Sequence, residues 1–266
     1  MVDNDRLMNF FKDTERVPFE NLESVLLVAV VKLEEGTNLN IKNIFDNVPI
    51  YSIPDYKRKN TKKVKIPHPG IPFTVLSAKC GKEIRGIVKN TNDFKQKDGN
   101  KGKFPNQVTL DLSLTDKVVN VMIFKNSMKI TGATHPNHFS QTMIFLKALF
   151  MVMHQKIAVW DKPITVTKID VIMENVIFDL GYPIKKDALR DLAVSQGLES
   201  PSEADAARVL YPMGFEKAKG GERYFNFRIL HTGKVVFSGN NRQAMKPIYD
   251  KFMDFIQSHE AEIRFV

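Results

Sequence analysis

The feature that most constrains this chain is a segment that occurs twice. The stretch 118–133, VVNVMIFKNSMKITGA, returns near the C-terminus at 225–239 as FNFRILHTGKVVFSG. Aligning Asn120 with Asn226 gives an offset of 106 (226 − 120), and the last glycine of each copy gives 107 (239 − 132), so one copy has a turn one residue longer. Each copy predicts a strand, a tight turn and a second strand, because β-branched and aromatic residues surround a break of Gly, Asn and Ser.

A segment with helical periodicity follows each copy of the hairpin. Residues 135–155 and 244–259 both place large apolar side chains at spacings of three, four and seven, which is typical of a helix with one buried face. A hairpin followed by a helix, present twice, indicates an internal duplication, and such a repeat dictates the architecture of the chain.

Composition narrows the class of protein. The longest strongly apolar run, 25–31, is far shorter than the roughly 20 residues that a membrane-spanning helix needs, and the first residues lack the pattern of a signal peptide. The one cysteine, Cys80, excludes an intramolecular disulfide framework and fits a reducing compartment. We therefore expect a soluble intracellular protein.

The charge of the chain is concentrated in one segment. The whole chain carries a net charge of +9 with a pI near 9.4, which favours polyanionic partners. Residues 56–103 hold 14 Lys and Arg against three acids, a local net of +11 (14 − 3), so the remainder sums to −2 (9 − 11). The duplicated part is therefore not itself strongly basic.

The first half of the chain contains an insertion. Residues 24–33 predict a strand whose faces are both mostly covered, and 40–46 a short helix capped by Asn38 or Asn40. The segment 51–103 then interrupts the repeat, with one hairpin that turns at Cys80-Gly81 between two basic flanks. These flanks fit either a solvated linker or an arm that grips phosphates.

The second half repeats the order of the first. Residues 107–114 predict a half-buried strand before the first hairpin, and the second half opens with a strand at 166–178, a helix at 184–196 and a crossing at 206–213 to a short strand near Phe215. Each half is then strand, helix, three strands and helix, which is an α+β fold. The predicted organisation is an N-terminal arm (1–21), a first repeat with the insertion (22–160) and a second repeat (161–266).

The two hairpins resemble the paired hairpin segments of the TATA-box-binding protein family. The residues that carry the resemblance are MIFKNSMKITGA (122–133) and ILHTGKVVFSG (229–239). Three further segments resemble that family's second repeat in the same order: YPIKKDAL from Tyr182, LYP from Leu210 and PIYDKF from Pro247. The resemblance extends over 22–260 apart from the insertion, and it suggests a divergent member, such as a homologue from a large DNA virus.

The resemblance implies a curved antiparallel sheet shared by two pseudo-symmetric repeats, a saddle whose helices cover the convex face. The opposite face of such a sheet meets the minor groove of DNA, where apolar side chains pry base steps apart and kink the duplex. The family's wedges are two phenylalanines per repeat. In this sequence Phe124 and Phe104 match the first pair, and Tyr211 and Leu230 occupy the second, with the alternative that these are ordinary sheet residues.

The resemblance also assigns the residues of the groove floor. The family uses one asparagine per repeat, which Asn175 matches in the second repeat, while its first-repeat counterpart falls at Lys32. The hydroxyl, valine and phosphate-contacting positions are Thr131, Ser238, Val236, Lys129 (in place of the other valine) and Lys234. Two lysines on this floor weaken the apolar fit to A·T base pairs, so the residues for bending are kept better than those for sequence choice.

No enzyme motif accompanies this pattern. The chain lacks GxxxxGK[ST], GxSxG and HExxH, and the two histidines that are close in sequence, His135 and His138, have no cysteines nearby. We therefore expect no catalysis, metal or cofactor.

Two hypotheses for the function stay open. One is a transcription initiation factor, a monomer on A·T-rich promoter DNA that recruits a TFIIB-like factor and RNA polymerase in the nucleus or at a site of viral transcription. The other is a protein-interaction module that has lost DNA binding.

Overall fold

The computed structural model describes residues 17–51, 70–86, 106–216 and 222–265 of the chain. The strands in this part are β1 (Ser24–Leu33), β2 (Thr74–Cys80), β3 (Glu83–Gly86), β4 (Val108–Ser113), β5 (Val118–Ile123), β6 (Ser127–Ala133), β7 (Val166–Asp179), β8 (Ala206–Glu216), β9 (Glu222–Leu230) and β10 (Lys234–Gly239). The helices are η1 (Phe19–Asn21), α2 (Ile41–Asn47), α3 (Asn137–His154), α4 (Lys186–Ser195), α5 (Arg242–Ser258) and α6 (Glu260–Ile263).

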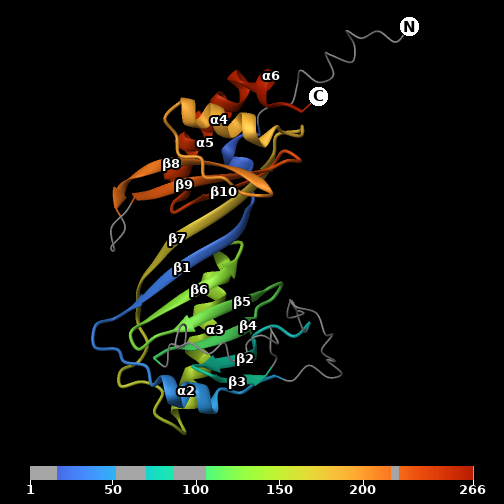
Figure 1. The fold of residues 1–266 in the computed structure, drawn as a ribbon. Helices are drawn as coiled ribbons and strands as arrows, with labels where there is room; N and C mark the ends of the chain where they lie inside the picture. Colours follow the sequence, from blue (N-terminus) through green and yellow to red (C-terminus); the bar gives the residue numbers. More distant parts are fainter. Residues whose placement is uncertain (1–16, 52–69, 87–105, 217–221, 266) are drawn as a thin grey trace. The chain divides into compact units, whose positions relative to one another are not determined.

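The strands form a sheet in the order β3-β2-β4-β5-β6-β1-β7-β10-β9-β8 (Figure 1). Neighbouring strands whose register is defined pair antiparallel. The predicted α+β class with an antiparallel sheet is therefore confirmed. The curved saddle with helices on its convex face stays a prediction.

The chain divides into two compact units. Unit 2 is Leu26–Ile172, and unit 1 combines the residues before Leu26 with those after Ile172. The division falls inside β7 and not at the predicted repeat boundary of 160/161, because the first half of β7 belongs with the strands of unit 2. The predicted arm is in part a piece of unit 1, since Phe19 is buried in the core of that unit.

The duplicated order of elements is confirmed. Unit 2 runs β1, α2, β4, β5, β6 and α3, and β7, α4, β8, β9, β10 and α5 repeat that sequence. The spatial order also repeats, as β4-β5-β6-β1 and as β8-β9-β10-β7. The predicted hairpin of the insertion is β2 and β3, which turn between Cys80 and Glu83 and extend the sheet beside β4. The basic flanks of the insertion fall largely outside the described residues.

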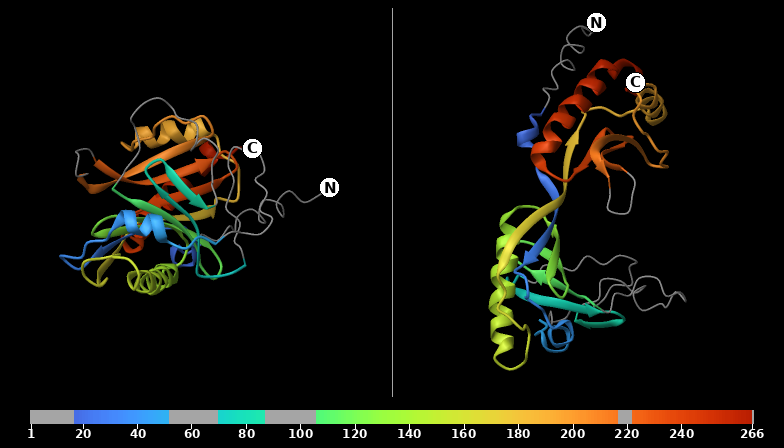
Figure 2. Two further views of the ribbon diagram at one scale, coloured as in Figure 1. Left: turned by 90° about the horizontal axis from the view of Figure 1, so that it is seen from below. Right: turned by 90° about the vertical axis from the view of Figure 1, so that its left-hand side faces the viewer.

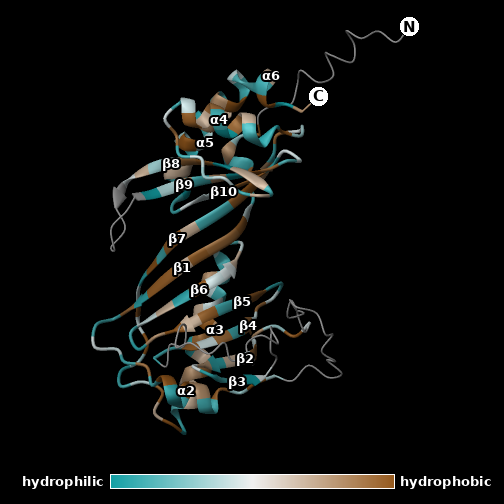
Figure 3. Cartoon of the chain, viewed as in Figure 1, coloured by the Kyte–Doolittle hydropathy of each residue, from teal (hydrophilic) through white to brown (hydrophobic). Residues whose placement is uncertain are grey.

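Local sequence explains where these elements begin and end. The valine-rich β1 is hydrophobic along most of its length (Figure 3), and its alternate residues Leu27, Ala29 and Val31 enter the core of unit 2. Asn40 caps α2 by accepting a hydrogen bond from the backbone N–H of Asn43, as predicted, and Asn241 caps α5 in the same way. The predicted crossing and short strand near Phe215 are wrong, because 206–216 form one continuous strand with a register shift after Pro212.

Each unit has its own core on one side of its strands. In unit 1 the rings of Phe227, Phe237 and Phe252 stack with centroids 4.0 and 3.9 Å apart, which joins β9, β10 and α5. In unit 2 the alternate residues of β4, β5 and β6 meet Phe139, Leu146 and Phe150 of α3. Figure 2 shows α5 along one face of the unit 1 strands and α3 along one face of the unit 2 strands. The remaining side chains of each strand therefore point to the opposite face.

Candidate nucleic-acid interface

The face of unit 1 opposite its core carries a mixed set of side chains, which we call open face 1. Its members alternate along each strand with core residues such as Val176, Phe227 and Val209. Cross-strand pairing places them in two rows: Ile177, Val236, Arg228 and Arg208 in one, and Asn175, Ser238, Asn226 and Leu210 in the other. Each row thus combines apolar contact surface with hydrogen-bonding groups.

The amide of Asn175 is the most exceptional polar group of open face 1. Its Oδ1 atom is buried yet has no hydrogen-bond partner among the described residues. Its cross-strand neighbour is Ser238, which is itself paired with Asn226. Buried polar atoms are normally satisfied, so an unpaired amide oxygen marks a position where a ligand can donate the missing hydrogen bond.

Two arginines of open face 1 are held by an acid from the loop before β8. Glu203 forms ion pairs with Arg228 (Nε to Oε2, 2.9 Å) and Arg208 (Nη1 to Oε1, 3.3 Å). Arg208 also donates a hydrogen bond from Nε to the side-chain oxygen of Asn226 at 3.3 Å. The two cations are therefore neutralised in part by the protein itself.

The corresponding face of unit 2, open face 2, is built from different side chains. Cross-strand pairing gives one row of Val30, Lys129, Met122, Thr109 and Lys79, and a second row of Val28, Thr131, Asn120, Asp111 and Ser77. These side chains alternate with core residues such as Val121 and Ile130. Open face 2 therefore has lysines and a carboxylate where open face 1 has a valine and a leucine.

A buried carboxylate organises the second row of open face 2. Asp111 is only 6% exposed. The hydroxyl of Ser77 donates to its Oδ2 at 2.5 Å, and Nδ2 of Asn120 donates to its Oδ1 at 3.1 Å. The amide nitrogen of Asn120 is thus engaged within the protein. Sequence reasoning missed Asp111, Asn120 and Glu203, because only strand register brings their partners beside them.

Five of the eleven residues of the predicted interface lie in the rows of the open faces. Asn175, Ser238 and Val236 belong to open face 1, and Thr131 and Lys129 to open face 2. Four more lie outside the core clusters: the wedge candidates Phe124 and Leu230 are half-buried, and the lysines Lys32 and Lys234 are exposed. Phe104 lies outside the described residues. Their roles in binding stay predictions.

The predicted position of Tyr211 is wrong. Its side chain belongs to the core of unit 1, where it is 9% exposed and its ring packs edge-on against Phe227 at 5.8 Å. Burial raises the pKa of Tyr211 to about 12, because the phenolate would lose its hydration. Tyr211 follows the same alternation as Val209, which places both on the core side, so the LYP segment does not present its ring to open face 1.

The predicted first-repeat counterpart of Asn175 is also wrong. Asn175 pairs with Ser238, and Thr131, which matches Ser238 at the offset of 107, pairs with Val28. The counterpart is therefore Val28 and not Lys32, which lies four residues further along β1 and pairs with Ser127. Lys32 instead lies at the end of β1 and forms an exposed ion pair with Asp170 at 3.8 Å.

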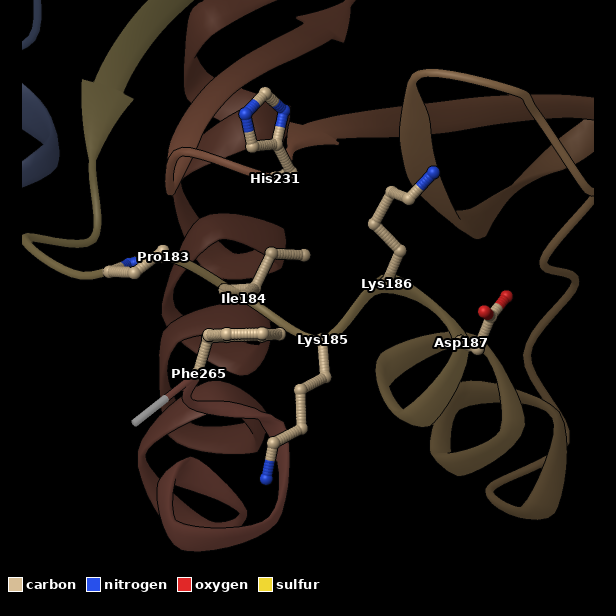
Figure 4. Close-up of a pocket in the computed structure, with 7 residues that line it drawn as sticks. All are labelled: Pro183, Ile184, Lys185, Lys186, Asp187, His231 and Phe265. Carbon is tan, nitrogen blue, oxygen red and sulfur yellow. The ribbon is translucent and has the colours of Figure 1, made fainter.

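A separate hollow lies in unit 1 where the chain enters α4 (Figure 4). It has a volume of about 420 Å³ and is lined by Pro183, Ile184, Lys185, Lys186, Asp187, His231 and Phe265. The close-up shows the Lys185 and Lys186 amines directed away from each other, and the Lys186 amine donates to the carbonyl of Ala204 at 2.6 Å. No member of either open-face row lines this hollow.

The described residues hold no group of three or more His, Cys, Asp or Glu side chains placed to bind one metal ion. Among the helices of this part of the chain, none has both the length and the hydropathy to cross a bilayer.

Comparison with known proteins shows similarity to solved structures. No protein-family model matches the chain, and no curated protein sequence matches it. Among solved structures, a Methanococcus jannaschii TBP superposes with a TM-score of 0.48 and 13% sequence identity, over 90% of this chain and 98% of that one.

Proposed function

We propose that this protein is a TBP-like transcription initiation factor that binds promoter DNA through the minor groove, bends it, and recruits a TFIIB-like factor and RNA polymerase. The observation that carries the proposal is the composition of open face 1. Its rows place an amide, a hydroxyl and two β-branched side chains in register on adjacent strands, at Asn175, Ser238, Ile177 and Val236.

Such a face suits the floor of an A·T-rich minor groove. A·T and T·A pairs both present only acceptor atoms there, the adenine N3 and thymine O2, and no exocyclic amine obstructs the floor. The amide nitrogen of Asn175 and the hydroxyl of Ser238 can donate to these acceptors, whereas Oδ1 of Asn175 is itself an acceptor and needs a donor from elsewhere. Val236 and Ile177, which is 43% exposed, can contact the groove floor without leaving a polar atom unpaired.

One partly exposed apolar residue per unit is available as a wedge. Phe124 follows β5 directly, and its backbone N–H donates to the carbonyl of Ser127 at 2.8 Å, which fixes its position in the turn. Leu230 ends β9 in the matching place of unit 1. Unstacking a base step costs a few kcal/mol, so a large apolar side chain at a flexible TA-type step is what bending requires.

The proposal is tested by measuring bending and binding separately. We expect the full chain to bend an A·T-rich duplex labelled at both ends for energy transfer, and we expect binding to weaken steeply with salt because each phosphate contact releases a counterion. Phe124→Ala should reduce bending more than it reduces binding. Phe145→Ala, which alters a half-buried ring on α3, is the control and should change neither. Absence of bending with any duplex at low salt contradicts the proposal.

A second candidate function is a protein-interaction module that keeps the fold without binding DNA. Two observations favour it: Tyr211 lies in the core, and Glu203 already neutralises Arg208 and Arg228. The absence of catalysis, the nuclear or viral site of action and the viral source stay predictions under either function.

A further inference from the structure

Helix α3 exposes a row of large apolar side chains to solvent. Ile144 is 71% exposed, Met151 55% and Val152 62%, and Ala148 between them is exposed as well. Their spacing of four, seven and eight residues puts them on one face of the helix, opposite the residues that enter the core of unit 2. We call these four residues the α3 stripe.

The fold does not require this stripe. Helix α5 holds the equivalent place in unit 1 and buries an apolar face of its own, including Met245, Tyr249 and Phe252. None of the large hydrophobic residues of α5 is exposed; its outer face carries side chains such as Gln243, Lys251 and Asp254. The contrast points to a use for the α3 stripe outside the folded unit, because contiguous exposed apolar surface is uncommon without a partner.

The charges beside the stripe indicate the partner's chemistry. On a helical projection Lys147 flanks the stripe on one side and Lys156, just beyond the helix, on the other, and neither amine forms an ion pair within the described residues. The segment 137–156 contains no Asp or Glu. A partner that covers the stripe therefore meets apolar side chains between cations.

We infer that the α3 stripe docks an amphipathic helix of another protein whose apolar face is bordered by acidic side chains. Such a helix buries its apolar face on Ile144, Met151 and Val152 and sets its carboxylates against Lys147 and Lys156. A second copy of this chain fits less well, because its own α3 brings only cations to the contact.

A designed peptide pair tests this inference with the full chain. Both peptides are helices of about 18 residues with leucine at positions i, i+3, i+4 and i+7; one has glutamates along the border of that face and the other has lysines. In fluorescence anisotropy we expect the glutamate peptide to bind about tenfold more tightly than the lysine peptide, with a difference that shrinks as salt is added. Equal binding of the two peptides, or no binding of either, overturns the inference.

Variants locate the binding. Ile144→Ser combined with Met151→Ser should abolish peptide binding, while Lys251→Ser on α5 should leave it unchanged. Lys147→Glu with Lys156→Glu should reverse the preference to the lysine peptide. The serine variant should keep the native melting temperature to within about 2 °C, since both side chains are solvated. A larger fall, or a dimer in sedimentation that the serine variant abolishes, assigns the stripe to packing or to self-association and overturns the inference.

Discussion

The two open faces are built on the same strand order, yet they carry different chemistry. Where open face 1 has Asn175 and Leu210, open face 2 has Val28 and Asp111 at the matching register positions. Oδ1 of Asn175 on open face 1 has no hydrogen-bond partner among the described residues, whereas Nδ2 of Asn120 on open face 2 donates to Asp111. The strands of both units therefore place apolar residues on the core side, while the residues on the opposite face differ between the units.

The two units also hold a buried carboxylate in different ways. Glu174 of unit 1 is 4% exposed and is paired with Arg242 at 2.6 Å, which also donates to backbone carbonyls of residues 19–22. Asp111 of unit 2 accepts hydrogen bonds from the hydroxyl of Ser77 and the amide of Asn120. The partners of the unit 1 carboxylate thus include an arginine, and those of the unit 2 carboxylate include two neutral donors.

The largest effect is expected from Arg242→Ala. It leaves Glu174 buried without a counter-charge, which costs about 3–5 kcal/mol of the free energy of unfolding. The one tryptophan of the chain, Trp160, lies in the core of unit 2, so its fluorescence follows that unit while circular dichroism follows both. In urea we expect the dichroism transition to move ahead of the Trp160 transition. Equal shifts would show that the units unfold together. The control, Lys246→Ala, breaks an exposed pair with Glu20 and should change the free energy of unfolding far less.

A second large difference is expected in alkali. Burial raises the pKa of Tyr182 and of Tyr211, both in unit 1, to about 12 from an ordinary value of 10.0. The unfolded state loses these protons first, so the stability that they provide is complete below pH 10 and is lost as the pH rises towards 12, by up to about 3 kcal/mol for each. Unit 1 should therefore lose structure in alkali before the Trp160 signal of unit 2 changes. Tyr211→Phe should reduce this sensitivity; an unchanged profile would contradict the prediction.

A smaller effect is expected when Asn175 and Asn120 are each replaced by alanine and the preference for A·T-rich duplex is compared. If open face 1 contacts bases, Asn175→Ala should reduce the preference for A·T-rich over G·C-rich duplex about tenfold, which corresponds to about 1.4 kcal/mol. Asn120→Ala should change that preference little, because its amide nitrogen already donates to Asp111. Competition binding with the two duplexes measures both. A larger effect at Asn120 would reverse the comparison between the faces.

The smallest effect is expected from Glu203→Gln. It frees Arg208 and Arg228 for phosphates, so affinity for DNA at low salt should rise about threefold and the salt slope should steepen by one to two. Glu260→Gln makes the same charge change at a carboxylate paired with Arg264 on α6 and should leave both quantities unchanged. Weaker binding by the Glu203 variant would show that this acid positions the arginines for DNA.

The sequence predicted the helices and strands well, but it predicted less well on which side of the sheet each strand residue lies. The strand 24–33, the cap at Asn40 and the repeated order follow from local periodicity and turn residues, and these were confirmed. The facing of Tyr211 and the counterpart of Asn175 depend on strand register. A one-residue irregularity, such as that between Leu27 and Val28, changes every later cross-strand match without leaving a mark in composition.

The site was predictable only where single residues define it. Asn175, Val236 and Ser238 could be placed from their segment, because alternation fixes their side of the strand. The pairing of Glu203 with two arginines could not, since it needs the loop before β8 to return over β8 and β9. The hydrogen bond of Asp111 could likewise not be predicted, because its donor Ser77 is 34 residues away in the sequence.

The split make-up of unit 1 has a consequence for biosynthesis. Ser24 hydrogen-bonds to Glu174, 150 residues later, and Phe19 and Leu22 belong to a core completed by the last helices. At about 5–20 residues per second, a ribosome needs on the order of 10–30 s to span that distance, and unit 2 emerges in full during the interval. Phe19 and Leu22 thus leave the ribosome well before the residues of α5 that complete their core.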